Sequence, residues 1–225
     1  MSTLPVTVLV LGASARGERA ATGQPSHDSV FEEHLQLAMR SGLPVHAVCS
    51  EPLRELALAW LPAQQVHVCP SLADESTADA LAQEVSLGIR ESGESEGWIL
   101  LCGDPIDLPP STLQDMARTL RAHRAPVLWA ERRGLREFPL GLGSELYSEL
   151  AVMRSDAAFQ KVLHRYPAES FVHGHGAAPA ASLSGTGTGT GTGSDSASWA
   201  GASPVLKRRH EVVRLGSLGQ PAARR

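Results

Sequence analysis

Residues 98–110, WILLCGDPIDLPP, contain the segment that decides the fold class. The four apolar residues Trp98 to Leu101 are too few for a helix, and the run is too continuous for a strand with one exposed face. This pattern predicts a strand buried on both faces, as in a parallel sheet covered by helices. Asp104 follows that strand, at the edge where open α/β sheets bind ligands. Asp104 is therefore either a metal ligand or simply part of a Gly-Asp-Pro turn, a common turn sequence.

Further apolar runs alternate with segments of helical period. The strand-like runs are Pro5–Leu11, Pro44–Cys49, Val66–Cys69 and Pro126–Ala130. Apolar residues recur with helical spacing over 28–41, 77–92 and 110–122, and a last helix ends before Pro167. This alternation predicts βαβ units in an α/β fold with a mostly parallel sheet.

The expected helix boundaries have suitable residues. Asp28 or Ser29 is expected to cap the first helix, and Ser41-Gly42 to close it. Pro110 stands at a first-turn position, where a proline is tolerated.

Composition narrows the function classes. The 225 residues have a net charge of −4, but residues 176–225 have a net positive charge, so residues 1–175 are acidic. An acidic body argues against a broad nucleic-acid surface. The sequence has no apolar run of about 18 residues, which argues against a membrane span. Three cysteines without a C-x-x-C pair suit a reducing compartment, so we expect a cytoplasmic protein.

The chain divides into three parts by composition. Residues 1–174 have the pattern of a folded domain. Residues 175–203 are small, polar and repetitive, with a Gly-Thr alternation, and are expected to form a disordered linker. Residues 204–225 are a basic tail that either forms a short strand or helix or remains loose.

A glycine-rich turn follows the first strand, with the sequence LGASARGER at residues 11–19. Such a turn can direct backbone N–H groups at a phosphate, and Arg16 or Arg19 would add positive charge. A side chain at Gly12 would fill the space that the phosphate needs. The sequence is neither a P-loop nor G-x-G-x-x-G, so the turn alone is a weak signal.

Four segments together resemble one family. VLVLGASARGER (8–19) is similar to the L-x-x-G-x-S-x-R-M-G-x-x-K opening of the MobA-like nucleotidyltransferases. EGWILLCGDPIDLPPSTLQDM (96–116) resembles their G-D-x-P segment. REFPLGLGSELYSEL (136–150) and SDAAFQKVL (155–163) resemble their R-G-H-P-V and G-D-x-G-A-R blocks. The order and spacing agree best with the cytidylyltransferase branch.

The resemblance implies a Rossmann-like three-layer αβα sandwich that transfers a nucleotidyl group from an NTP (CTP favoured over GTP) to a molybdopterin-type cofactor. By this resemblance Asp104 binds Mg²⁺, Arg16 and Asp104 act in catalysis, and Asp156 matches an aspartate of unspecified role. The implied nucleotide-binding residues are Gly12, Ala13, Ser14, Arg16 and Arg19.

The sequence also departs from the family pattern. The family's loop lysine falls near Ala21, with Arg19 before it, and arginine differs from lysine in shape. Pro105-Ile106 displaces the usual proline, and Glu137-Phe138-Pro139 replaces G-H-P. In place of a carboxylate-bearing D-x-D-T-P stands FVHGHGAAP (171–179). Its His173 and His175 could bind a transition metal, but such a pair in a Gly-rich stretch is more often without function.

These departures leave two alternatives to catalysis. One is a pseudoenzyme of the same fold that binds nucleotide or pterin, or assists molybdoenzyme maturation by contacting a molybdoenzyme or its chaperone. The other is a plain α/β scaffold whose basic tail docks onto a protein.

Overall fold

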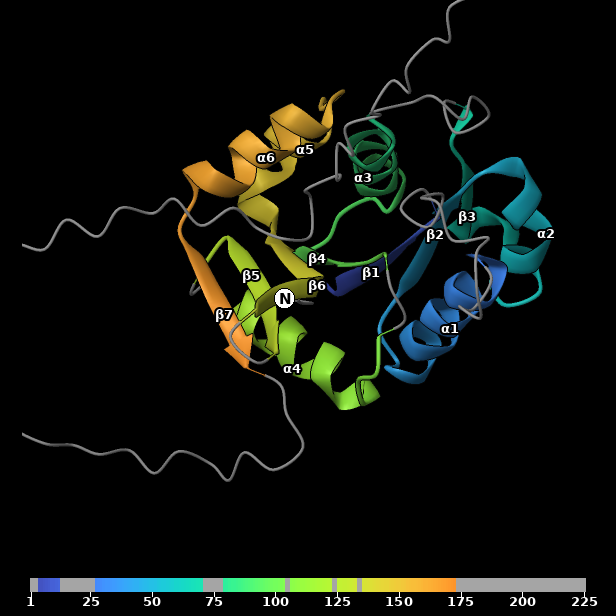
Figure 1. Ribbon diagram of the computed structural model, residues 1–225, viewed down its shortest axis with the longest axis horizontal. Helices are drawn as coiled ribbons and strands as arrows, with labels where there is room; N and C mark the ends of the chain where they lie inside the picture. The colour runs from blue at the N-terminus through green and yellow to red at the C-terminus, as the bar shows by residue number, and fades with distance from the viewer. Residues whose placement is uncertain are drawn as a thin grey trace, which may run out of the picture. The chain divides into compact units, whose positions relative to one another are not determined.

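The computed structural model describes residues 4–12, 27–70, 79–103, 106–122, 125–132 and 135–172. Within these ranges, seven strands form one sheet with the order β3-β2-β1-β4-β6-β5-β7 (Figure 1). The strands are β1 (Val6–Leu11), β2 (Val45–Cys49), β3 (Val66–Val68), β4 (Gly97–Leu101), β5 (Val127–Arg132), β6 (Leu135–Gly143) and β7 (Ala168–Val172). β6 runs antiparallel to β4 and β5, whereas the other neighbouring pairs are parallel. The predicted mostly parallel sheet is therefore confirmed.

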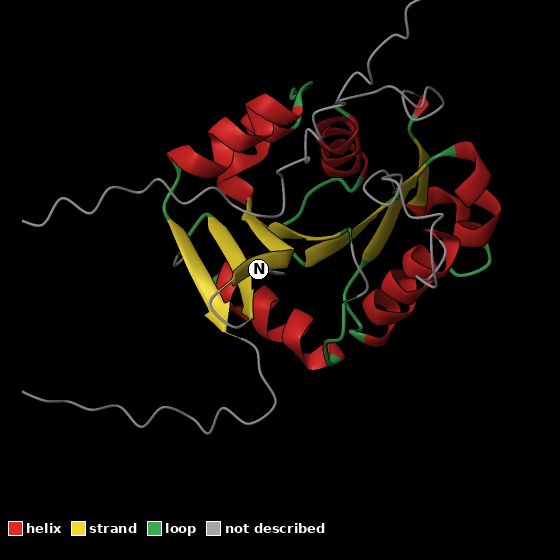
Figure 2. Cartoon of the chain, in the orientation of Figure 1, coloured by secondary structure: helices red, strands yellow, loops and turns green. Residues whose placement is uncertain are grey.

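Helices cover both faces of the sheet (Figure 2). They are α1 (His27–Arg40), α2 (Glu51–Leu58), α3 (Ala80–Glu91), α4 (Pro110–Arg121), α5 (Tyr147–Leu150) and α6 (Asp156–Arg165). Figure 1 shows α1 and α4 on one face and α3, α5 and α6 on the other. This is the three-layer αβα sandwich that the resemblance implied.

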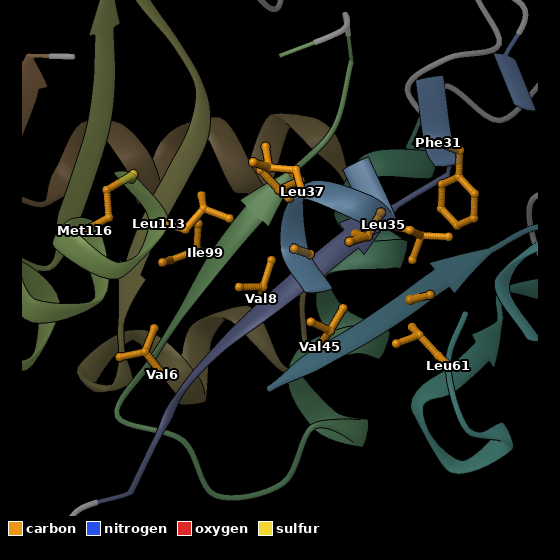
Figure 3. Close-up of a cluster of buried hydrophobic side chains, with 14 of the residues drawn as sticks. Val6, Val8, Phe31, Leu35, Leu37, Val45, Leu61, Ile99, Leu113 and Met116 are labelled. Atoms are coloured by element: carbon orange, nitrogen blue, oxygen red, sulfur yellow. The ribbon is translucent and has the colours of Figure 1, made fainter. Parts of the chain in front are cut away.

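The central strands β1 and β4 are buried along their whole length. On one face, Val6 and Val8 of β1 and Ile99 of β4 pack against α1 and α4 in the main apolar cluster (Figure 3). On the other face, Gly88 lets α3 approach closely, because a Cβ there would lie 2.9 Å from Val48 Cγ2. The prediction that residues 98–101 form a doubly buried strand is correct.

Some boundaries differ from the predictions. The closing turn of α1 at Gly42 (φ 71°) and Pro110 as the first residue of α4 are as expected. The predicted cap of α1 is wrong, because the helix already begins at His27 and Asp28 lies in its first turn. Its negative charge there still favours the helix N-terminus.

Four of these helices and strands were not predicted from the apolar pattern: α2, the four-residue α5, β6 and β7. The eight-residue α2 buries only Leu53 and Ala57, too few positions to show a helical period. β6 contains Pro139, Gly141 and Gly143, residues that are uncommon in strands. β7 is short and begins directly after Tyr166-Pro167. Among the described residues, no helix is both long and apolar enough to cross a membrane.

A pair of histidines joins β2 to the edge strand β3. His46 Nδ1 and His67 Nε2 lie 2.9 Å apart, and the rings are stacked with 9° between their planes. Both side chains are half-buried. Burial lowers the pKa of both imidazoles, and the charge of His67 lowers the pKa of His46 further, whereas Glu91 on α3 opposes this. The folded protein therefore favours neutral rings that share one hydrogen bond.

This pair predicts a loss of stability in mild acid. A histidine with a lowered folded pKa takes up its proton more readily in the unfolded chain, so stability falls as pH drops below the ordinary value of 6.5. We expect the melting temperature of wild type to fall between about pH 7.5 and about pH 5 more than that of the His46→Gln/His67→Gln variant. Thermal unfolding at a series of pH values measures this, and parallel curves for the two proteins would contradict it.

Candidate functional site

At the centre of the sheet, the strands of the first and second segments of the family resemblance lie side by side. β1 lies between β2 and β4, and Val10 pairs with Leu101, so Gly12 and Gly103 follow these strands at the same carboxyl edge. This is the point where the chain connections diverge to the two sides of the sheet, and open α/β sheets bind ligands there. The structure thus places Gly12, directly before the predicted loop, and Gly103, directly before Asp104, at the same edge of the sheet.

Most of the predicted site residues lie outside the described residues. This holds for Ala13, Ser14, Arg16, Arg19 and Asp104, and likewise for Ala21, Pro105, His173 and His175. Gly103, directly before Asp104, has a φ of 87°, a left-handed conformation that favours glycine. The chain therefore turns sharply where β4 ends. Within the described part of the chain, the histidine, cysteine, aspartate and glutamate side chains form no group of three that could hold a metal ion.

Gly12 is enclosed by the protein. Its N–H donates to the Val48 carbonyl (2.9 Å) and to Glu84 Oε1 (3.1 Å). A Cβ at this position would lie 3.1 Å from Leu53 Cδ1 and 3.2 Å from Cys49 Cα. The glycine therefore permits β1 to end against β2 and α2. Phosphate contacts from the loop remain a prediction for residues 13–19.

Glu84 is a feature of this edge that the sequence reasoning missed. It lies on α3 with 0% of its surface exposed, although charged side chains are almost never fully buried without partners. A signal existed, because Glu84 falls within the apolar stripe formed by Leu81, Val85 and Gly88. The partner of its carboxylate, Gly12, is 72 residues away in the sequence and could not be inferred from spacing.

Cys49 at the end of β2 is not a reactive group. Burial raises the pKa of its thiol to about 12, and the nearby carboxylates of Glu84 and Glu51 add to the rise. The thiol therefore stays protonated at neutral pH and does not act as a nucleophile or thiolate ligand. Cys69 and Cys102 are also buried. The prediction that the cysteines act as small core residues fits this environment.

Asp156 and Asp79 each cap the other's helix. Asp156 Oδ1 accepts a hydrogen bond from the Ala82 N–H in the first turn of α3 (2.9 Å). Asp79 Oδ1 accepts one from the Asp156 N–H, which begins α6 (3.1 Å). Both helices thereby gain an acceptor for an N–H that the helix itself leaves unbonded. The structure assigns Asp156 a role in joining α6 to α3.

The segment Glu137-Phe138-Pro139 lies in β6, next to β4. Leu100 pairs with Leu140 in the antiparallel register, so this segment extends toward the edge where Gly103 lies. Phe138 is buried against Trp129, with ring centroids 6.3 Å apart. The third segment of the resemblance therefore reaches the same edge as the first two.

A hollow of about 550 Å³ lies at the opposite end of the central strands. It is lined by Leu4, which precedes β1, and by Trp98, Ser144 and Tyr147 among others. Because it adjoins the amino ends of β1 and β4, it is separate from the candidate site.

This architecture defines a Rossmann-like α/β protein whose candidate site lies at the carboxyl ends of β1 and β4. The sequence profile of the MobA-like NTP transferase domain matches residues 17–170, and the chain belongs to this family of nucleotidyltransferases. No curated protein sequence matches the chain significantly. The resemblance inferred from the four segments is confirmed.

Solved structures share the fold. Rv0371c from Mycobacterium tuberculosis H37Rv is 20% identical, with a TM-score of 0.56 over 76% of this chain and 89% of that one. The same protein in complex with manganese gives 18% identity and a TM-score of 0.54 over 76% and 89%. A homologue from Mycobacterium sp. strain JC1 is 15% identical, with a TM-score of 0.52 over 75% and 85%. At these identities the likeness concerns the fold.

The contacts of Gly12 predict that any side chain at this position lowers the stability of the fold. Gly12→Ala should lower the free energy of unfolding by about 1 kcal/mol and Gly12→Val by about 1–3 kcal/mol, because the added atoms press on Leu53 and on the backbone of Cys49. Urea unfolding measures both. If Gly12→Val proved as stable as wild type, the strand ends would have to move apart freely.

The paired caps predict coupled losses of stability. Asp156→Ala and Asp79→Ala should each cost about 1 kcal/mol, the usual value for a lost helix cap. The double variant should cost less than the sum, because each cap depends on the same contact between α3 and α6. A double-mutant cycle by urea unfolding tests this, and strict additivity would mean that the caps act independently.

Proposed function

We propose that this protein transfers a nucleotidyl group from an NTP, with CTP favoured over GTP, to a molybdopterin-type cofactor. The observation that supports the proposal is the pairing of β1 with β4, which brings Gly12 and Gly103, the residues directly before the predicted loop and Asp104, to one edge. The family match spans the second, third and fourth segments and part of the first. The position of the Glu137–Pro139 segment at this edge supports an acceptor-side role.

The roles of the loop residues follow from their chemistry. Backbone N–H groups of residues 13–15 and the Ser14 hydroxyl would bind phosphate oxygens, and Arg16 would contribute positive charge. Arg19 would supply part of the charge that the family's lysine provides, with the planar geometry of a guanidinium. An in-line displacement at phosphorus needs mainly alignment and charge neutralisation, and these groups offer both.

Asp104 would hold the divalent cation. Its carboxylate has the oxygen donors that Mg²⁺ prefers, and it directly follows Gly103, which lies at the edge where β1 ends. When bound, Mg²⁺ would neutralise charge on the phosphates. The manganese complex of Rv0371c supports a divalent cation in this fold. We further propose that the protein is cytoplasmic and that its protein partner is a molybdoenzyme or the chaperone of one.

Nucleotide binding should depend on Mg²⁺ and on Asp104. In a thermal-shift screen of CTP, GTP, ATP and UTP, each with and without MgCl₂, we expect CTP with Mg²⁺ to stabilise wild type most. A ligand at about a hundred times its Kd adds about 2.7 kcal/mol of stability. Asp104→Asn should keep wild-type stability without ligand but lose the Mg²⁺-dependent gain and any transferase activity.

Asp107→Asn is the matched control, because Asp107 is an exposed aspartate on the same connection to α4. It should behave as wild type. Mg²⁺-dependent binding of NTP without pyrophosphate release, when a molybdopterin-type cofactor is supplied, would favour the pseudoenzyme. Failure of wild type to bind any of the four nucleotides would contradict the proposal.

A further inference from the structure

The hollow at the amino ends of β1 and β4 has the size of a small-molecule site. Its volume of about 550 Å³ falls within the range of about 300–1,000 Å³ that is usual for such sites. Leu4, Trp98 and Tyr147 line it. Trp98 is buried, with its ring centroid 6.1 Å from that of Tyr147, whereas Leu4 and Tyr147 are 40% and 46% exposed. The hollow therefore offers apolar and aromatic surface that is open to solvent.

The connection between α3 and β4 forms one side of the hollow and is held by hydrogen bonds. Trp98 Nε1 donates to Ser92 Oγ (2.9 Å). The Ser95 hydroxyl lies 2.8 Å from the Pro5 carbonyl oxygen and 2.7 Å from that of Gly97. This side of the hollow is thus preorganised, which reduces the cost of ordering it around a ligand.

The polar groups of the hollow favour a cation. Glu94 and Glu96 both line it, and Arg121 offsets part of the charge of Glu96, because Arg121 Nε lies 3.6 Å from Glu96 Oε2. The exposed Glu94 carboxylate has neither an ion pair nor a hydrogen bond within the described part of the chain. The same holds for hydrogen bonds of the Ser144 and Tyr147 hydroxyl groups. A negative charge and two hydroxyl groups are therefore available to a ligand beside the aromatic surface.

We propose that this hollow is a second binding site, which takes a small organic cation with a flat apolar body, an arylalkylammonium ion being the simplest example. Glu94 attracts the ammonium group, and the ring of Tyr147 provides a face for the cation or for the apolar body. An anion of the same shape is repelled by the two carboxylates, so the site discriminates by charge. The candidate nucleotide site lies at the opposite ends of the same strands, so the two ligands do not compete.

The test is isothermal titration calorimetry of the full chain with two probes of the same shape and opposite charge. These are phenethylammonium chloride and sodium 3-phenylpropionate. We expect wild type to bind the cation about tenfold more tightly than the anion, because Glu94 attracts one and repels the other.

Two variants separate the charge from the aromatic surface. Glu94→Gln keeps the size of the side chain and should weaken phenethylammonium binding about threefold, without weakening 3-phenylpropionate. Tyr147→Leu keeps apolar bulk but removes the ring, and should weaken phenethylammonium about threefold. Glu33→Gln is the matched control, because Glu33 is an exposed glutamate on α1, which covers the other face of the sheet. It should leave both Kd values unchanged.

Equal affinity for the two probes, or no detectable binding of either, would overturn the inference. An unchanged Kd for phenethylammonium in Glu94→Gln, or an equal loss in Glu33→Gln, would do the same. A second copy of the chain that covers the hollow would appear in sedimentation velocity as a dimer that Tyr147→Lys dissociates, and this result would also overturn it. None of these outcomes bears on nucleotide binding, so the proposed function stands or falls separately.

Discussion

The pairing of β1 with β4 is the constraint on which the rest of the structure depends. Both strands are apolar on both faces, and their backbone polar groups can be satisfied in the interior only by neighbouring strands. Two buried faces require helices on each side, which α1 and α4 supply on one and α3 on the other (Figure 1). The same pairing brings Gly12 and Gly103 to one edge, so the packing of the core also determines the position of the candidate site.

A buried carboxyl group at this edge has a structural cost and a consequence. Placing Glu84 in the interior is unfavourable unless its carboxylate is hydrogen-bonded, and the Gly12 N–H provides such a bond. Because Gly12 is also held by Val48 and packed near Leu53, the residue that follows β1 is fixed from several directions. The loop that follows therefore begins from a rigid point, a condition for aligning reacting groups.

The apolar sequence pattern and the family resemblance predicted different parts of the structure. The doubly buried strand at 98–101 and the closing turn at Gly42 follow from local composition, because burial and left-handed backbone leave direct signals. β6 was found only as a motif of the resemblance, since its proline and two glycines obscure the alternation of a strand. The Glu84–Gly12 contact joins residues 72 apart, and only the packing of α3 on the sheet creates it. Local sequence carries no signal for such a contact.

The position of α3 explains why the first and last segments of the family pattern belong together. Asp156, from the last segment, caps the start of α3, and Gly12, from the first, donates to Glu84 one turn further along. One turn beyond Glu84, Gly88 allows α3 to pack closely against β1 and β2. A shift of α6 would thus move α3 and, through Glu84, the end of β1. Two segments more than a hundred residues apart constrain one another through a single helix, although they share no direct contact among those described above.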